Sequence, residues 1–253
     1  MPAKVNVMKN KQICPLDIII PVYNEADVIS QTLDEIAQKI DIQHRILIVY
    51  DFDEDSTVPV VKKYIKKNNI KHIVLCKNIL GKGALNAIKT GFKKAESESI
   101  LVVMGDASDD LIAVKFMYQK IQEGCDVVCG SRYMQGGKQI GGPVFKKFLS
   151  RMAGLSLNLL TGIPVHDVTN SFKIYRRSFI ESIEIESVGG FEIGMEILVK
   201  AFLNGKKIDE VPSTWHDRTD GTSNFKLFKW LPHYLKWYFI AVVGRCFKRK
   251  LSL

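Results

Sequence analysis

The sequence predicts an α/β protein, in which a mostly parallel sheet carries helices on both faces. Short apolar runs alternate with segments whose apolar residues recur at helical spacing, and the alternation continues through the first half of the chain. The composition agrees, because 46% of the 253 residues are hydrophobic and 25% are charged, which excludes a disordered or collagen-like chain. A chain of this length suits one large domain with an appendage.

The expected elements follow in order from residue 16. An apolar run predicts a buried strand at 16–22, and apolar positions at helical spacing predict a helix at 28–40. Ser56 is expected to cap a helix that runs to about Asn68, with Pro59 tolerated in its first turn. The remaining elements are expected as strands at 45–50, 72–76, 99–104 and 126–129 and as helices at 84–95 and 111–122. This order of strand, helix and strand is typical of βαβ units.

Acidic residues follow three of the predicted strands, those at 16–22, 45–50 and 99–104. The loops are Tyr23-Asn24-Glu25, Asp51-Phe52-Asp53-Glu54-Asp55 and Asp106-Ala107-Ser108-Asp109-Asp110. Carboxyl ends of parallel strands gather at one edge of a sheet, where ligands bind, and like charges gathered there need a cation. Asp106 and Asp109 are therefore expected to hold Mg²⁺ or Mn²⁺ against a diphosphate. The alternatives are solvated loops, and a helix-capping role for Asp109 or Asp110.

The segment Gly81-Lys82-Gly83-Ala84 opens a predicted helix, which indicates an anion site. It is not a P-loop, because Cys76 stands where the first glycine should be and Gly83 follows the lysine. It is not a full dinucleotide fingerprint either, because Asn86 occupies the last Gly/Ala position. Lys82 is expected to reach a phosphate, with an ordinary surface lysine as the alternative.

Positive charge is concentrated at the C-terminal end. The net charge is +9, from 36 Lys and Arg against 27 Asp and Glu. Residues 225–253 hold seven basic residues and no acid, which leaves +2 on the first 224 residues. The basic residues are mixed with Trp and Tyr in one apolar segment, so they favour a membrane surface over nucleic acid.

That segment is expected to form an interfacial anchor. Residues 230–244 are apolar and aromatic, but Pro232, His233 and Lys236 interrupt them, and about 15 residues fall short of the roughly 20 that span a bilayer. The basic residues at 245–250 would form a rim among the lipid headgroups. The alternative is a helix packed on the domain or against a second protomer, as in a homo-oligomer.

The cysteines and the N-terminal segment favour the cytoplasm. Five cysteines, an odd number, are scattered along the chain. Cys125 and Cys129 have no histidine nearby to complete a zinc site and are expected to be buried free thiols, which suits a reducing compartment. Residues 1–14 form a polar leader that does not resemble a secretory signal. The protein is therefore expected to be peripheral on the cytoplasmic face of the membrane.

A series of short motifs occurs in a fixed order along residues 16–226. The series is Pro21-Val22-Tyr23-Asn24-Glu25, the acidic loop 51–55, Asn78 to Gly83 with Asn86-Ala87 and Gly91-Phe92, Asp106, Gly130-Ser131-Arg132-Tyr133, Asp167 to Lys173, Glu192 to Glu196, and Glu210-Val211-Pro212 to Arg218 with Gly221 and Ser223. No single motif is specific, but the ordered set resembles glycosyltransferase family 2, and within it the dolichyl- or polyprenyl-phosphate sugar transferases.

The resemblance implies a fold and a set of site residues. It implies a GT-A fold for residues 15–224, with residues 225–253 as the interfacial tail. The residues implied to bind the nucleotide sugar are Pro21, Tyr23, Glu25, Asp51, Lys82, Asp106 and Arg132. Asp106 would be the metal ligand, and Arg132 and Arg218 would meet the diphosphate or the acceptor phosphate, which suits the bidentate geometry of arginine.

Two positions depart from the family pattern. The usual D-x-D would place its first acid at Met104, whose thioether is not a ligand for a hard cation, so the pattern here is Asp106-x-x-Asp109. The usual D-D-G-S becomes Tyr50-Asp51-Phe52-Asp53. The family pattern alone therefore does not determine the metal geometry or the base preference.

For the reaction, the resemblance implies transfer with inversion, from GDP-mannose or a UDP-hexose to a polyprenyl or dolichyl phosphate. Such a phosphate is ionised near pH 7 and needs no base, so the metal and arginine groups would stabilise the leaving diphosphate. Asp167 is the candidate base if the acceptor is instead a saccharide or lipid-linked glycan hydroxyl. A non-catalytic nucleotide-binding module docked at membranes is the remaining alternative. The sugar, the lipid length and the oligomeric state stay open.

Overall fold

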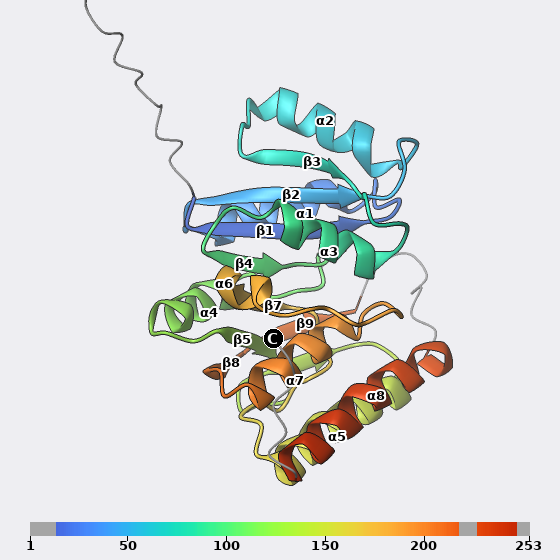
Figure 1. Ribbon diagram of the computed structural model, residues 1–253. Helices are drawn as coiled ribbons and strands as arrows, with labels where there is room; N and C mark the ends of the chain where they lie inside the picture. Colours follow the sequence, from blue (N-terminus) through green and yellow to red (C-terminus); the bar gives the residue numbers. More distant parts are fainter. Residues whose placement is uncertain (1–13, 218–226, 247–253) are drawn as a thin grey trace, which may run out of the picture.

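The computed structural model describes residues 14–217 and 227–246. Seven strands of these residues form one sheet (Figure 1): β1 (Leu16–Val22), β2 (His44–Tyr50), β3 (Ile73–Lys77), β4 (Ser99–Val102), β5 (Val127–Ser131), β7 (Lys173–Arg176) and β8 (Ile208–Pro212). Their order in the sheet is β3-β2-β1-β4-β7-β5-β8. Two short strands, β6 (Lys138–Ile140) and β9 (Thr214–His216), pair separately.

The sheet is mostly parallel, as the sequence predicts. β1 pairs in parallel with β2 and with β4, while β7 runs antiparallel between β4 and β5. The chain therefore adds β2 and β3 on one side of β1 and then places β4 on the other side of β1. Such a reversal opens a crevice at the carboxyl ends of the two strands, where α/β proteins bind ligands.

Helices cover both faces of the sheet (Figure 1). The helices are α1 (Ile29–Lys39), α2 (Thr57–Asn68), α3 (Ala84–Lys94), α4 (Ala113–Gln122), α5 (Val144–Thr161), α6 (Arg177–Glu181), α7 (Ile193–Leu203) and α8 (Leu227–Cys246). Side chains of β1 alternate between two cores: Ile18 and Ile20 pack with α1 and α4, while Ile19 packs with α3 and α7. All three isoleucines are fully buried, as expected for a strand covered on both faces.

The C-terminal helix α8 belongs to this core on one face. Trp237 is 1% exposed, and Trp237 and Ala241 pack in the same cluster as residues of α5 and α7. The opposite face exposes Phe239 and Val243. The predicted alternative, a helix packed on the domain, therefore holds for the inner face of α8. In the described ranges, no helix combines the length and hydrophobicity needed to cross a bilayer.

Several predicted details change in the structure. Ser56 makes no side-chain capping bond; instead Asp55 accepts the Thr57 N–H at 2.8 Å through Oδ1, because its carboxylate reaches past Ser56. β4 ends at Val102, before the predicted Met104, since the Met104 N–H donates to Asp109 and leaves the ladder. The prediction of buried free thiols is confirmed for Cys125 and Cys129. Residues 1–13 of the predicted leader lie outside the described residues.

Candidate active site

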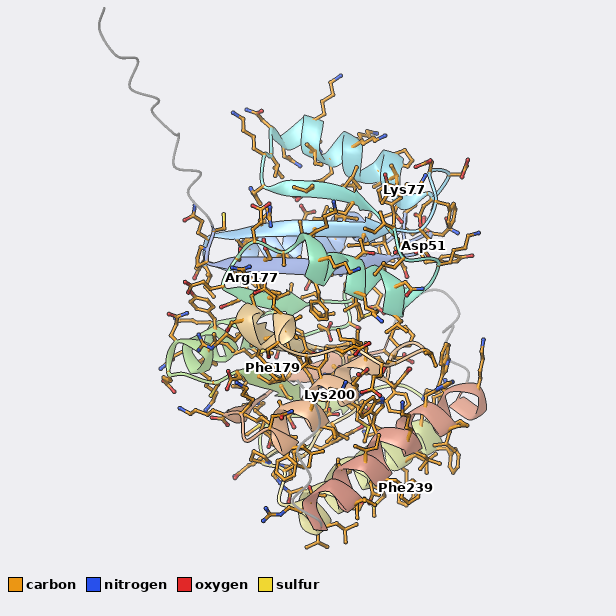
Figure 2. All side chains as sticks on the ribbon, in the orientation of Figure 1. Asp51, Lys77, Arg177, Phe179, Lys200 and Phe239 are labelled. Atoms are coloured by element: carbon orange, nitrogen blue, oxygen red, sulfur yellow. The ribbon has the colours of Figure 1, made fainter. Side chains whose placement is uncertain are left out.

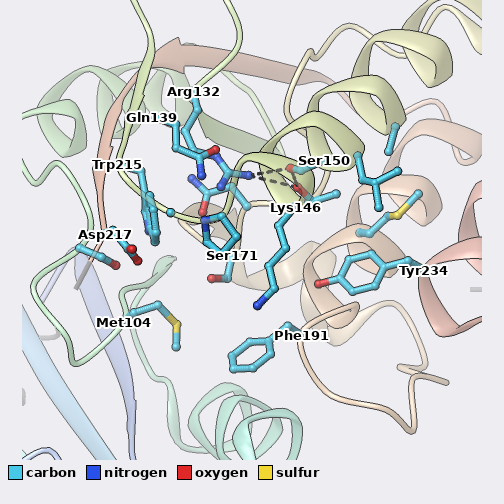
Figure 3. A pocket seen from close by; sticks show the side chains of 18 of the residues that line it. Met104, Arg132, Gln139, Lys146, Ser150, Ser171, Phe191, Trp215, Asp217 and Tyr234 are labelled. Atoms are coloured by element: carbon cyan, nitrogen blue, oxygen red, sulfur yellow. Dashed lines mark hydrogen bonds between the residues drawn. The ribbon is translucent and has the colours of Figure 1, made fainter. Parts of the chain in front are cut away.

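A cavity of about 430 Å³ lies at the carboxyl end of β4 and reaches between α5 and α8 (Figure 3). Its polar end is lined by Asp106, Ser108 and Arg132. Its other end is lined by apolar and aromatic side chains of the two helices: Leu149 and Ala153 from α5, and Leu231, Tyr234, Leu235 and Tyr238 from α8. One continuous space therefore joins an acidic strand end to an apolar groove.

The acidic loop after β4 places its two candidate ligands differently. Asp106 lines the cavity and accepts the Ser108 N–H at 3.2 Å. Asp109 is 6% exposed, does not line the cavity, and accepts the Met104 N–H at 3.1 Å. Burial, and then the nearby Asp106 charge, raise the pKa of Asp109 to about 7. Asp106 is therefore the member of the predicted pair that faces a ligand.

This site fits a hard divalent ion by the type of its ligands. Asp106 and Asp217 both line the cavity and supply carboxylate oxygens, while the thioether of Met104 lines it without being a hard ligand. Within residues 14–217 and 227–246, no three His, Cys, Asp or Glu side chains close around one point. Mg²⁺ is commonly held by one or two carboxylates and completed by substrate phosphates. The residues present fit that mode of binding.

Arg132 enters the cavity from the end of β5 and is fixed by Asp167. Asp167 is fully buried and accepts Arg132 Nε at 2.6 Å and Nη2 at 3.0 Å. The same Nη2 donates to Ser150 and Thr169 (Figure 3). Burial by itself would raise the pKa of Asp167, but the Arg132 charge and hydrogen bonds outweigh it and hold the pKa below its ordinary value. The guanidinium is thus held rigidly at the cavity wall.

A buried lysine holds the loop between α5 and β7, which carries the Arg132 partners Asp167 and Thr169. Lys173 is fully buried at the start of β7, and its ammonium donates to the carbonyls of Val168 and Asn170. Burial lowers the pKa of Lys173. The Asn170 side chain in turn donates to the Gly130 carbonyl at 3.0 Å. The loop between α5 and β7 is therefore tied to the end of β5, next to Arg132.

Lys146 was not among the predicted site residues. It extends from the first turn of α5 into the cavity, between Ser171, Phe191 and Tyr234 (Figure 3). The signal that could have found it is local: apolar residues at 144, 145, 148, 149 and 152 recur at helical spacing around the lysine. Such a pattern predicts an amphipathic helix that places a cation beside apolar surface.

The small sheet of β6 and β9 covers one side of the cavity. The His216 N–H donates to the Ser108 carbonyl at 3.0 Å, which ties β9 to the acidic loop. Trp215 and Asp217 face the cavity close to Met104 (Figure 3). An aromatic face and a carboxylate side by side are suited to the apolar and hydroxyl surfaces of a sugar. Sequence reasoning had not singled out Trp215 or Asp217.

The remaining predicted site residues lie at the neighbouring ends of β1 and β2. Pro21 is buried within β1, and Tyr23 is 53% exposed directly after it. The Glu25 N–H donates to Thr57 Oγ1 at 2.9 Å. Asp51 follows β2, and Lys82 lies near it, in the loop before α3. These residues share one edge of the sheet with Asp106, whereas Arg218 lies outside the described residues.

The fold and the acidic strand end define the class of GT-A glycosyltransferases, and comparison with known proteins agrees. The structure resembles glucosyl-3-phosphoglycerate synthase from Mycobacterium tuberculosis, solved with Mn²⁺, UDP and phosphoglyceric acid, with a TM-score of 0.62 at 14% identity over 92% of this chain and 78% of that one. A second structure of that enzyme, with Mg²⁺ and UDP, gives a TM-score of 0.63 at 15% identity, covering 92% and 79%. At these identities the likeness concerns the fold.

The chain belongs to glycosyl transferase family 2, whose family model matches residues 17–184. It is 30% identical over 235 residues to the dolichol-phosphate mannosyltransferase of Pyrococcus furiosus, which covers 88% of this chain. The matched region spans 64% of that relative's length. It is also 27% identical over 210 residues to the polyprenol monophosphomannose synthase of Mycolicibacterium smegmatis, covering 81% of this chain and 79% of the relative. The predicted family resemblance is thereby confirmed.

Proposed function

We propose that this protein transfers one sugar, with inversion, from a nucleotide sugar to a polyprenyl-type phosphate at a membrane surface. The observation that carries the proposal is the cavity itself, which is acidic at the end of β4 and apolar between α5 and α8. A phosphate on a long apolar chain matches such a space, because its charge can meet Arg132 and Lys146 while its chain follows the groove. The names of the two relatives support the same acceptor class.

The donor end of the site is assigned to Asp106. With a nucleotide sugar bound, a divalent ion held by Asp106 would neutralise charge on the diphosphate as it leaves. Arg132 lines the same cavity, where Asp167 fixes its orientation. The two side chains would together hold the diphosphate and the acceptor phosphate.

The acceptor end needs no general base. A phosphate monoester is largely ionised near pH 7, since its second pKa is about 6. Asp167, the predicted base for a hydroxyl acceptor, has both oxygens engaged by Arg132 and a lowered pKa, so it is poorly suited to take a proton. We therefore assign Asp167 a positioning role. Lys146 and Ser150, which line the cavity beside Arg132, would complete the phosphate site.

We further propose that α5 and α8 together rest on the membrane. The two helices lie side by side (Figure 1), and α8 turns Phe239 outward (Figure 2). The outer apolar side chains of the pair, 41 to 84% exposed, are Val144, Phe145, Phe148, Met152, Leu159, Leu160, Leu235, Phe239 and Val243. Exposed basic side chains flank them at Arg151, Lys236 and Arg245. The proposed membrane face therefore includes α5, a helix outside the predicted anchor of residues 225–253. Of the basic rim predicted at 245–250, residues 247–250 lie outside the described residues.

The membrane assignment predicts a loss of vesicle binding when charge is placed on this face. The double variant Phe148→Glu/Phe239→Glu is expected to bind anionic phospholipid vesicles at least about tenfold more weakly, because two aromatic side chains no longer enter the lipid. Co-sedimentation measures the effect. The matched control is Ile112→Glu/Phe116→Glu, which alters two comparably exposed apolar residues, one just before α4 and one within it, and should bind as the parent does. Equal binding of all three proteins would contradict the assignment.

The proposed face is the cytoplasmic one. The buried free thiols of Cys76, Cys125 and Cys129 support it, because free cysteines suit a reducing compartment.

The acceptor class is tested by comparing a polyprenyl phosphate with the polyprenol of the same length. Wild-type protein is incubated with a panel of GDP- and UDP-sugars and Mg²⁺ or Mn²⁺, and the lipid product is extracted. We expect product from the phosphate alone, abolished by a chelator. Product from polyprenol or from a glycan would replace the phosphate acceptor by a hydroxyl, and tight nucleotide binding without transfer to any acceptor would favour a non-catalytic module.

A further inference from the structure

A buried lysine of α7 is surrounded by acceptors. Lys200 is 1% exposed, and its ammonium donates to the Glu184 carbonyl and to Glu186 Oε1, the latter at 2.7 Å. The fully buried Glu196, one turn earlier on α7, places its Oε1 3.0 Å from the same ammonium. Three acceptors therefore compensate the buried charge, as its removal from water requires. Figure 2 shows Lys200 on α7, the helix that packs beside α8.

The same ammonium faces an aromatic ring of α8. Lys200 Nζ lies over the Trp237 ring, 5.3 Å from its centroid, and Trp237 is 1% exposed. The ammonium of Lys236 lies 5.0 Å from that centroid and 3.7 Å from Glu186 Oε2. A tryptophan face attracts a cation most strongly where water is excluded. Glu186, Glu196, Lys200 and Trp237, here called the Lys200 cluster, therefore join α7 and α8.

Trp237 belongs to the stretch of α8 that lines the apolar half of the cavity. Tyr234 precedes it by three residues and Tyr238 follows it directly, and both tyrosines line the cavity. The Tyr238 hydroxyl donates to Ser156 Oγ of α5 at 2.9 Å. α8 thus contacts α5 through Tyr238 and α7 through Trp237. A displacement of Trp237 would carry both tyrosines with it, because one helical backbone holds all three.

The segment between α6 and α7 connects the Lys200 cluster to the cavity a second time. Glu196 accepts the N–H of Glu186 at 2.6 Å and that of Ser187 at 2.8 Å, which fixes the first part of the segment. Phe191, near the other end of the segment, lines the cavity (Figure 3). The cluster therefore lies behind two parts of the cavity wall, the α8 side chains and Phe191.

We propose that Lys200 and Trp237 are positioning residues that hold the α8 wall of the groove in place for the acceptor chain, and so set a preference for a long chain. The inference rests on the proposed function and deepens it. A buried ion pair adds little stability over apolar side chains of similar volume, which favours a positioning role. Leu231 and Tyr238 lie about 10 Å apart along α8. A chain of several isoprene units can contact that whole wall, whereas a single unit cannot.

Sugar transfer to two phosphates of different chain length tests the proposal. Dimethylallyl phosphate has one isoprene unit and farnesyl phosphate has three; each is offered to the full chain with Mg²⁺, the donor from the panel that wild type uses best, and no vesicles. Trp237→Leu is expected to lower kcat/KM for farnesyl phosphate by about tenfold, mainly through KM. Its KM for the nucleotide sugar, and its kcat/KM for dimethylallyl phosphate, should stay within about twofold of wild type.

Three further variants separate positioning from a general loss of structure. Trp237→Phe keeps a ring for the ammonium and should restore most of the preference for farnesyl phosphate. Lys200→Gln/Glu196→Gln removes both charges of the ion pair and should reproduce the effect of Trp237→Leu without a cavity in the core. Lys120→Met, the control, removes a lysine that pairs with Asp209 outside the groove and should behave as wild type. Thermal unfolding of each variant shows that it is folded at the assay temperature.

Two results would overturn the inference and leave the proposed function intact. One is a wild-type kcat/KM that differs by less than about twofold between the two phosphates, since the groove would then not sense the chain. The other is an equal loss for both phosphates, or no loss, in Trp237→Leu and in the double variant, which would leave the Lys200 cluster a role in stability alone. Failure of wild type to transfer sugar to any polyprenyl phosphate would overturn the proposed function as well.

Discussion

Asp106→Asn is expected to lower kcat/KM for sugar transfer by at least about a thousandfold, equivalent to about 4 kcal/mol of transition-state stabilisation. Asp106 is the acid of the β4 loop that lines the cavity, and the substitution removes its charge without changing its size. The asparagine carbonyl can still accept the Ser108 N–H that Asp106 accepts at 3.2 Å. The loop should therefore keep its conformation while its affinity for the divalent ion falls.

Two measurements separate this expectation from a general loss of structure. Titration with Mn²⁺ in the presence of a nucleoside diphosphate should show weaker metal binding in Asp106→Asn at an unchanged unfolding temperature. Asp53→Asn is the control, because Asp53 also follows a strand of the same edge but is 66% exposed and pairs with Lys77. Its activity should stay within about twofold of wild type. Activity of Asp106→Asn within tenfold of wild type would show that another group holds the ion.

The strand-end acids could be predicted from the sequence because their signal is local. Periodicity places the strands, and parallel strands bring their carboxyl ends to one edge, so Tyr23, Asp51 and Asp106 were expected together. What periodicity does not give is the direction of each side chain. Asp106 and Asp109 both follow β4, yet only Asp106 lines the cavity, because Asp109 turns back to accept the Met104 N–H.

The apolar half of the site could not be predicted in the same way. The groove between α5 and α8 exists only after two helices about 80 residues apart in the chain pack together. Composition also does not distinguish the two faces of α8. Trp237 is buried and Phe239 is 60% exposed, although both aromatic residues suggested the same interfacial anchor. Tertiary packing decides which of them meets the core and which remains available to a membrane.

Asp167→Asn is expected to destabilise the fold by about 3 kcal/mol, a typical cost of breaking one side of a buried ion pair. Arg132 would remain buried with a neutral partner that accepts through one oxygen, whereas Asp167 now accepts Nε and Nη2 through both. For a chain of this size the unfolding temperature should fall by about 6–12 °C. Urea denaturation measures the free energy directly. Glu181→Gln, which breaks the exposed pair with Arg177, should change it by less than about 0.5 kcal/mol.

The ion pair between Arg132 and Asp167 should also make the stability of the fold depend on pH. The folded-state pKa of Asp167 is lowered, so its contribution is present above the unfolded value of about 3.9 and is lost as pH falls through the folded value. Wild type should therefore lose stability more steeply than Asp167→Asn in acid. Parallel curves would show that the carboxylate is not stabilised by Arg132.

Kinetics distinguish a positioning role for Asp167 from the role of a general base. If Asp167 orients Arg132, Asp167→Asn should raise the KM for donor or acceptor and leave the shape of the pH–rate profile unchanged, because no proton passes through it. If Asp167 were the base for a hydroxyl acceptor, kcat would collapse and the acidic limb of the profile would disappear.

The double variant Arg132→Met/Asp167→Leu adds a structural check, since removal of both charges should restore part of the stability that Asp167→Asn loses. Restored stability without restored transfer would assign the charge of Arg132 to the reaction and that of Asp167 to holding it in place.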